Sequence, residues 1–208
     1  MKILICDDHK IVRDGLRQLI LPLTYFSLVA EAGSGAEALA ILKQDEFDVL
    51  LLDISLPDMS GMEVLQVVKT KWPKINVLML SMRPHEQYAM RAHNLGASGY
   101  LTKEATAEEL LKALSVVAKG DKYVSEALVN NIAGNISNNT SKYLHDTLSA
   151  REFEILLQIA NGISLQDIGN ELFISSKTVT TYRSRILSKM EMTSNSEIVK
   201  YCIENKLI

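Results

Sequence analysis

The sequence predicts an α/β fold with a doubly wound parallel sheet of five strands, followed by a small all-α domain of four helices. Short apolar runs alternate with helix-periodic segments from Lys2 to about Gly120. Four of these runs read as strands that are covered on both faces of a parallel sheet. From about Leu148 the apolar spacing is helical only. A length of 208 residues accommodates both domains.

The expected elements of the first domain follow one another as strand and helix. Gly33 and Gly35 precede one helix, and Pro57 and Gly61 mark the loop before the next. Thr106 is suited to start the last helix of this domain. The expected strands lie near 2–6, 27–32, 48–52, 75–80 and 99–102, and the expected helices near 10–21, 35–44, 61–71, 85–95 and 106–119.

The second domain is expected after a polar connection. Residues 125–136 fit one short helix, and the Asn-rich stretch 137–142 is typical of a linker. Ser149 begins a capping box, and Gly162 stands where a helix C-terminal cap belongs. We therefore divide the chain into a first domain at 1–120, a helix and flexible linker at 121–145, and a second domain at 146–208. The helices expected in the second domain lie at 148–160, 165–172, 176–190 and 195–204.

Composition is typical of a globular protein with buried cores. The net charge of −3 does not indicate a general affinity for nucleic acid, so any contact with nucleic acid must come from a local basic patch. The longest apolar stretches are too short to span a bilayer. Because the chain enters an expected strand at once, we expect no signal peptide. We expect a soluble, cytoplasmic protein that does not bind membranes. Cys6 and Cys202 are expected to be buried, reduced thiols.

Charged and polar side chains stand at the carboxyl ends of four expected strands, namely Asp7 with Asp8, Asp53, Ser81 and Lys103. In an open α/β sheet these strand ends form the functional edge. Three carboxylates, one hydroxyl and one ammonium are therefore expected to converge.

The acidic residues of this edge are suited to hold Mg²⁺, a cation that prefers oxygen ligands. We expect Asp8 and Asp53 as direct ligands, with Asp7 close by or acting through water. The backbone carbonyl of Ser55 is a further candidate ligand. Adjacent carboxylates repel one another unless a cation lies between them. Because an aspartate carboxylate can attack phosphorus, Asp53 is a candidate phosphoacceptor, whose added charge the metal and Lys103 would offset.

Residues 1–120 resemble the receiver domain of bacterial response regulators. The resemblance implies a flavodoxin-like fold with strand order 2-1-3-4-5. It also implies that a sensor histidine kinase phosphorylates Asp53, that Ser81 moves toward the phosphoryl group, and that Tyr100 rotates inward behind it. The resemblance further implies no enzymatic activity beyond Mg²⁺-dependent self-phosphorylation from a phosphodonor and autodephosphorylation. The matching residues are Asp7, Asp8, Asp53, Pro57, Gly61, Ser81, Tyr100 and Lys103.

Two positions depart from the receiver pattern. Many receivers carry a small residue after the switch hydroxyl, where this chain has Met82, a side chain expected to narrow access to Asp53. Many also carry Pro after the lysine, where this chain has Glu104.

Basic residues of the second domain are concentrated in one expected helix and the turn before it. Residues 173–190 carry four basic side chains and no acid, whereas the rest of 146–208 carries three basic residues and eight acids. A helix that approaches DNA phosphates needs such a local charge. The hydroxyl side chains within 178–181 are poor choices for a helix surface on propensity alone, but they suit base contacts in a major groove.

Residues 148–190 resemble a LuxR-type DNA-binding domain with a helix-turn-helix. The resemblance implies that Thr180, Thr181 and Ser184 read base edges of a double-stranded operator with two half-sites. The family often has His where Tyr182 stands, so the base preference is not predicted. The implied phosphate contacts are Lys177, Arg183, Arg185 and Lys189.

The last expected helix offers a narrow apolar stripe of Ile198, Val199 and Cys202. The resemblance implies that this helix forms a dimer contact. We expect a homodimer when the protein is phosphorylated.

Two alternatives remain open at this point. A haloacid-dehalogenase-like phosphatase also forms an aspartyl phosphate, but it has a second Asp where this chain has Ser55. The other alternative is a DNA-binding protein with a vestigial receiver, against which the complete acidic edge argues.

Overall fold

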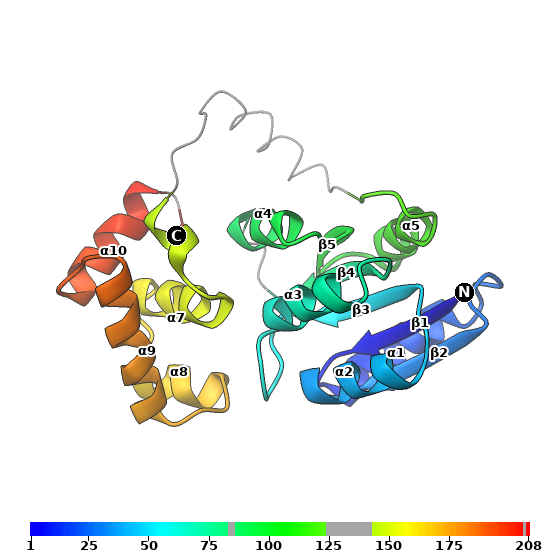
Figure 1. The fold of residues 1–208 in the computed structure, drawn as a ribbon, viewed down its shortest axis with the longest axis horizontal. Helices are drawn as coiled ribbons and strands as arrows, with labels where there is room; N and C mark the ends of the chain where they lie inside the picture. Colours follow the sequence, from blue (N-terminus) through cyan, green and yellow to red (C-terminus); the bar gives the residue numbers. More distant parts are fainter. Residues whose placement is uncertain (83–85, 124–142, 206) are drawn as a thin grey trace. The chain divides into compact units, whose positions relative to one another are not determined.

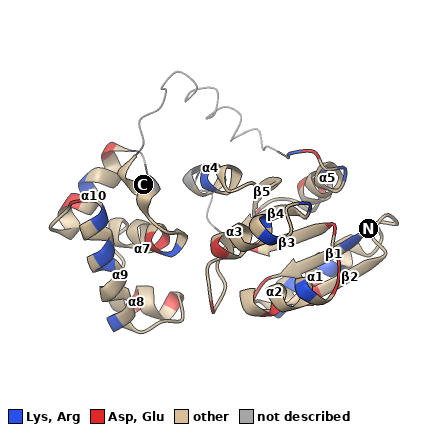
Figure 2. Ribbon diagram, in the orientation of Figure 1, with Lys and Arg blue, Asp and Glu red and all other residues tan. Residues whose placement is uncertain are grey.

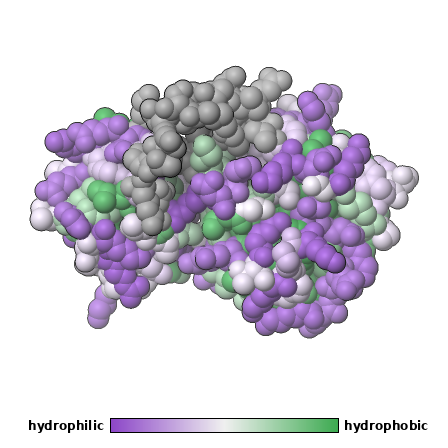
Figure 3. Space-filling model, turned by 45° about the horizontal axis from the view of Figure 1, so that its top comes forward, coloured by the Kyte–Doolittle hydropathy of each residue, from purple (hydrophilic) through white to green (hydrophobic). Residues whose placement is uncertain are grey.

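The chain divides into two compact units, Met1–Ser137 and Asn138–Ile208 (Figure 1). The structure, a computed structural model, describes residues 1–82, 86–123, 143–205 and 207–208. The helix expected over 125–136 and the linker expected over 137–142 therefore lie outside the described residues. No helix in the described ranges has both the length and the apolar character that crossing a membrane requires. The face shown in Figure 3 is mostly hydrophilic, with apolar surface in small separate areas.

The first unit contains a parallel sheet of five strands in the order β2-β1-β3-β4-β5. This order confirms the predicted flavodoxin-like topology. Each strand lies within one or two residues of its predicted position, and β3 is buried along its whole length, as its uninterrupted apolar run predicts. The strands are β1 (Lys2–Cys6), β2 (Leu28–Ala32), β3 (Val49–Asp53), β4 (Asn76–Ser81) and β5 (Gly99–Thr102).

Helices cover both faces of this sheet (Figure 1). Alternate strand residues such as Ile3, Leu51 and Leu80 share one core with α1 and α5. Right-handed crossovers in this strand order place α2, α3 and α4 on the opposite face, and α2 contacts α3 there. The helices are α1 (Lys10–Ile20), α2 (Gly35–Gln44), α3 (Gly61–Lys71), α4 (Glu86–Asn94) and α5 (Ala107–Ala118).

The loop between β3 and α3 folds back on the end of β3. The backbone N–H of Gly61 donates to the carbonyl of Ile54 at 2.8 Å, and Ser55 pairs with Ser60 in an antiparallel bridge. A Cβ atom on Gly61 would lie 1.9 Å from the carbonyl oxygen of Asp53. The first turn of α3 can therefore approach Asp53 only because residue 61 is glycine.

The second unit is helical, as predicted. Each α-helix in the described part of this unit begins after a serine whose side chain accepts a hydrogen bond from a backbone N–H three residues later, at Ser149, Ser164, Ser175 and Ser194. The predicted capping box at Ser149 is present, and the buried Val179 and Ile186 of α9 share the interior with α7 and α8. The elements are a short 3₁₀ helix η1 (Leu144–Thr147), α7 (Ala150–Ala160), α8 (Leu165–Glu171), α9 (Ser176–Lys189) and α10 (Asn195–Glu204).

Candidate functional sites

Side chains from three strand ends meet at the carboxyl edge of the sheet. Asp7 follows β1, Asp53 ends β3 and Lys103 follows β5. The Lys103 ammonium lies 2.6 Å from Asp7 Oδ2 and 2.7 Å from Asp53 Oδ2. One cation thus pairs with two buried carboxylates, and the pocket keeps an excess of negative charge.

Asp53 is held in an environment that disfavours its charge. Its side chain is 1% exposed, and burial raises the pKa of its carboxyl to about 6, although Lys103 opposes the shift. Its Oδ1 atom is buried and has no hydrogen-bond partner in the described part of the chain. Burial alone would lower the pKa of Lys103, but Asp53 and Asp7 outweigh it and raise that pKa. A buried carboxylate oxygen without a donor is an expected position for a cation or an incoming electrophile.

The ligand atoms of Asp7, Asp8, His9 and Asp53 all lie within 4.8 Å of one another. His9 Nδ1 is 2.7 Å from Asp8 Oδ1, and the His9 side chain is largely exposed. Carboxylate oxygens are the ligands that Mg²⁺ prefers, and the unpartnered Asp53 Oδ1 belongs to this set. The residues present therefore fit a divalent cation. Ser55, the fourth predicted ligand, is an exposed residue of the loop that follows β3.

The two predicted switch residues are buried near this pocket. Ser81 ends β4 and is 4% exposed, and Tyr100 on β5 is 8% exposed. Burial raises the pKa of the Tyr100 hydroxyl to about 12, and Ser81 reduces this shift. Met82, directly after Ser81, is 64% exposed.

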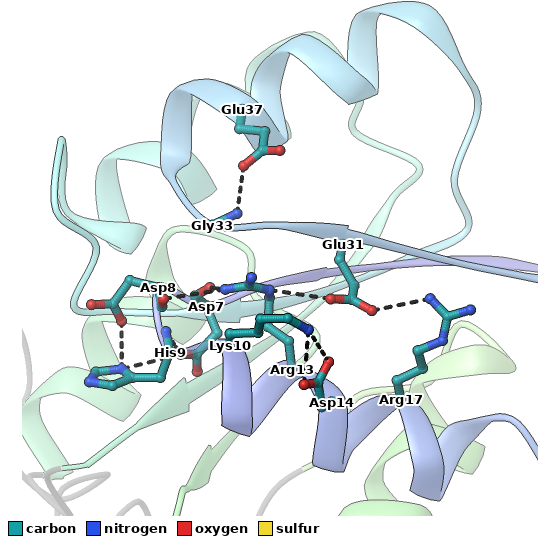
Figure 4. Close-up of polar contacts among 10 residues, drawn as sticks. All are labelled: Asp7, Asp8, His9, Lys10, Arg13, Asp14, Arg17, Glu31, Gly33 and Glu37. Carbon is teal, nitrogen blue, oxygen red and sulfur yellow. Dashed lines mark hydrogen bonds and ion pairs between the residues drawn. The ribbon is translucent and has the colours of Figure 1, made fainter.

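Two further polar residues support the acidic edge and were missed by the sequence analysis. Arg13 of α1 donates from Nη1 to the carbonyl oxygens of Asp7 at 2.7 Å and Asp8 at 3.3 Å (Figure 4). Asp58, in the loop after β3, accepts from the backbone N–H groups of Gly35 at 2.9 Å and Ala36 at 2.7 Å. Asp58 joins segments that are distant in the chain, whereas Arg13 reaches back from α1 to the end of β1, so neither contact follows the spacing of a single helix or strand.

Because its pKa is raised, Asp53 is predicted to lower the free energy of unfolding of the first unit at neutral pH. An unfolded Asp carboxyl titrates near 3.8 and the folded one near 6, so the stability that the protonated carboxyl contributes is lost as pH rises through about 6. In metal-free protein, Asp53→Asn should be more stable than wild type above pH 6, by up to roughly 3 kcal/mol. Urea unfolding with chelator can be followed by fluorescence of Trp72, the only tryptophan of the chain, at the end of α3. A difference that is the same at pH 4 and pH 8 would contradict this assignment.

The exposed face of α9 carries the predicted base-reading residues. Thr180, Thr181 and Ser184 are exposed, whereas Val179 and Ile186 are buried on the other side of the helix. Each of the three hydroxyls donates to the carbonyl four residues earlier, at 2.9, 3.1 and 3.0 Å respectively. Figure 2 shows basic residues along α9, which contains no Asp or Glu. The geometry is compatible with a helix that enters a DNA groove.

The four basic residues of α9 are not equivalent. Lys177 and Arg185 are exposed, but Arg183 donates from Nε to Asn195 Oδ1 at 2.6 Å. Lys189 pairs with Glu152 Oε2 of α7 at 2.6 Å. Burial raises the pKa of Glu152, but Lys189 and the hydrogen bonds from Ser149 together outweigh burial, so that pKa is lowered. Lys189 therefore ties α9 to α7, which the sequence did not indicate.

The apolar stripe predicted for dimer contact lies mostly inside the second unit. Ile198 and Cys202 are both 0% exposed, and α10 packs on α7. Their side chains belong to the core and are not available to a partner at the surface. Val199 is half-buried, and Ile203, which we did not predict, is 60% exposed. A dimer contact through α10 would therefore use the latter pair.

Comparison with known families and proteins gives matches in both units. Residues 3–115 match the model of the response regulator receiver domain, and residues 146–202 match that of the bacterial regulatory proteins of the luxR family. The chain is 34% identical over 215 residues to the oxygen regulatory protein NreC of Staphylococcus carnosus, covering 100% of this chain and 99% of NreC. NreC of Staphylococcus aureus strain JH9 matches with the same identity and coverage.

Solved structures show the same fold. The RcsB response regulator of Salmonella typhimurium superposes with a TM-score of 0.66 at 24% identity, covering 97% of this chain and 96% of that one. A LuxR-family response regulator from Aurantimonas sp. SI85-9A1 superposes with a TM-score of 0.61 at 30% identity, covering 66% of this chain and 98% of that one.

Proposed function

Because this chain belongs to the bacterial response regulators that join a receiver domain to a LuxR-family DNA-binding domain, we propose that phosphorylation of Asp53 controls its binding to DNA. The observation that carries this proposal is the buried Asp53 Oδ1, which has no hydrogen-bond partner in the described chain and lies in a cluster of carboxylates beside Lys103. The phosphodonor is a sensor histidine kinase. An Asp53 oxygen forms a bond to phosphorus as the bond between phosphorus and the kinase histidine breaks.

The acidic pocket supplies the groups that this transfer needs. Asp7, Asp8, Asp53 and the Ser55 carbonyl would hold Mg²⁺, which neutralises charge on the phosphoryl oxygens when bound. Lys103 already contacts Asp53 and would pair with the phosphorylated side chain. Any catalytic activity is limited to self-phosphorylation from a small phosphodonor and to autodephosphorylation.

The second unit reads DNA with α9. Thr180, Thr181 and Ser184 lie on its exposed face and would contact base edges in the major groove. Lys177, Arg183 and Arg185 would contact phosphates, with Arg183 oriented by its hydrogen bond to Asn195. Lys189 would contribute less to phosphate binding than these three residues, because its ammonium pairs with Glu152.

Phosphorylation is proposed to favour a homodimer on an operator with two half-sites. A small helix-turn-helix unit reads a two-fold operator well only as a dimer. RcsB of Salmonella enterica serovar Typhimurium has been solved bound to promoter rprA in the presence of phosphomimetic BeF3⁻. Ser81 and Tyr100, buried at β4 and β5, are the proposed elements that carry the change from Asp53.

The decisive experiment compares the unmodified and phosphorylated full chain. Phosphorylation from acetyl phosphate, or BeF3⁻ treatment, should raise both the dimer population in sedimentation and the affinity for an operator selected from random DNA. Ser81→Ala should leave Asp53 modifiable but remove both effects. If both forms have the same sedimentation mass and the same operator affinity, phosphorylation does not control dimerisation or DNA binding, and the alternative of a vestigial receiver is favoured.

The DNA contacts predict a difference between two lysines of the same helix. Lys177→Met should weaken binding to all sequences and reduce the salt slope by about one unit, as expected for one lost phosphate contact. Lys189→Met should change the salt slope less and instead lower the stability of the second unit, because it leaves Glu152 buried without its cation. Fluorescence-anisotropy titrations at several salt concentrations and thermal unfolding measure the two effects. Equal salt slopes for both variants would contradict the structural role of Lys189.

A further inference from the structure

Arg13 is the one side chain in the described ranges that hydrogen-bonds to the backbone carbonyls of both Asp7 and Asp8 (Figure 4). Its Nη1 atom donates to the two successive carbonyl oxygens at 2.7 and 3.3 Å. In an extended strand, successive carbonyls point in opposite directions, so one nitrogen cannot reach both. The contact therefore requires the chain to turn directly after β1, where the two carboxylates stand.

The guanidinium of Arg13 is itself held by an ion pair with β2. Arg13 Nε lies 3.3 Å from Glu31 Oε2 on β2, and its side chain is only 15% exposed. The same carboxylate pairs through Oε1 with Arg17 Nη1 at 3.2 Å. A side chain anchored by an acid and largely removed from solvent has few alternative conformations. It can hold the loop in one geometry, because little entropy remains to be lost.

His9, the residue just before α1, also contacts the two aspartates that follow β1. The backbone N–H of His9 donates to Asp7 Oδ1 at 2.9 Å, and His9 Nδ1 lies 2.7 Å from Asp8 Oδ1. The carbonyls of Asp7 and Asp8 are thus held by α1, while their carboxylates join the cluster with Asp53. The orientation of the acidic pair depends on a residue that is not itself a ligand.

We infer that Arg13 is a positioning residue that orients Asp7 and Asp8 for divalent-cation binding, through their backbone carbonyls. This inference rests on the proposed function, since the cation serves the phosphorylation of Asp53. Groups that orient metal ligands typically contribute about 10- to 100-fold to metal affinity. Arg13 also carries a positive charge near the site, and by Coulomb's law alone its removal would tighten cation binding. Loss of positioning would weaken cation binding and loss of charge would tighten it, so the direction of the change in affinity shows which effect dominates.

The test measures Mn²⁺ binding to the full-length chain by the loss of the free-ion EPR signal. Arg13→Met keeps an unbranched stem but removes the donors, and it should weaken Mn²⁺ binding roughly 10-fold or more. Arg17→Met is the matched control, because it removes the same charge and a contact with the same Glu31 but does not touch the loop. It should bind Mn²⁺ within about twofold of wild type, as expected for an ion pair whose Arg side chain is half-exposed to solvent. Arg13→Lys, which retains charge but not the planar fork, should bind with intermediate affinity.

Trp72 fluorescence during unfolding shows whether each variant of the first unit is folded under the binding conditions. If Arg13→Met does not fold, the comparison of Arg13→Lys with Arg17→Lys replaces it. Mn²⁺ binding by Arg13→Met at or above wild-type affinity would overturn the inference, as would an equal loss in Arg17→Met. Failure of wild-type protein to accept phosphate at Asp53 would instead refute the proposed function, whatever the Mn²⁺ results.

Discussion

Asp53→Asn is expected to abolish phosphoryl incorporation from acetyl phosphate in the presence of Mg²⁺. Asn carries no nucleophilic carboxylate oxygen. Asp7 contacts His9 and Lys103 through its two oxygens and Asp8 contacts His9, whereas Asp53 has one oxygen, Oδ1, with no hydrogen-bond partner among the described residues. Intact-mass spectrometry of the full chain should show one phosphoryl group on wild type and none on the variant. Peptide mapping should place that group on Asp53.

The control for this prediction is Asp14→Asn, which removes an exposed carboxylate of α1 that pairs with Lys10 and lies outside the acidic cluster. Its labelling should equal that of wild type. Excess chelator should suppress labelling of both proteins, since the cluster of Asp7, Asp8 and Asp53 is proposed to act with a cation. Phosphate found on another residue, or labelling that persists in chelator, would show that the pocket has been misassigned.

Gly61→Ala, which adds a single methyl group, is expected to destabilise the first unit strongly. The new Cβ would lie 1.9 Å from the Asp53 carbonyl oxygen and 2.8 Å from its carbonyl carbon, both of them backbone atoms that cannot rotate away. The start of α3 must move or the end of β3 must shift. We expect a loss of about 3 kcal/mol or more in the free energy of unfolding. The displaced Asp53 backbone should also slow phosphorylation.

Gly15→Ala is the matched control, because Gly15 lies within α1 and a Cβ there meets no atom within 4 Å. Alanine is a better helix former, so this variant should gain roughly 0.5–1 kcal/mol. Urea unfolding followed by Trp72 fluorescence isolates the first unit in both variants. A Gly61→Ala protein with wild-type stability would mean that α3 does not approach Asp53 as closely as described.

Local sequence determined the architecture of both units. A strand that is buried on both faces needs apolar residues at successive positions. The uninterrupted apolar runs that end at Cys6, Asp53 and Ser81 therefore predicted strands. Serine caps marked the helix starts at Ser149 and Ser175, because a hydroxyl at that position satisfies backbone donors three residues later. Strand ends also indicated which side chains share an edge, and the structure places Asp7, Asp53 and Lys103 in ion-pair contact there.

The partners that these side chains take were decided only by tertiary structure. Lys189 pairs with Glu152, 37 residues away, so a charge that suggested DNA contact serves to join two helices. Ile198 and Cys202 formed an apolar stripe that the sequence could not distinguish from a dimer surface, because a helix buries its apolar face in the same way against its own core or a partner.

The same limit applies to the residues that support the acidic edge. Arg13 reaches Glu31 across 18 residues, and Asp58 reaches Gly35 across 23. Periodicity and capping record the preferences of residues within one helix or strand. Hydrogen bonds between segments depend on how the sheet brings those segments together, and a single sequence contains no local signal of that distance.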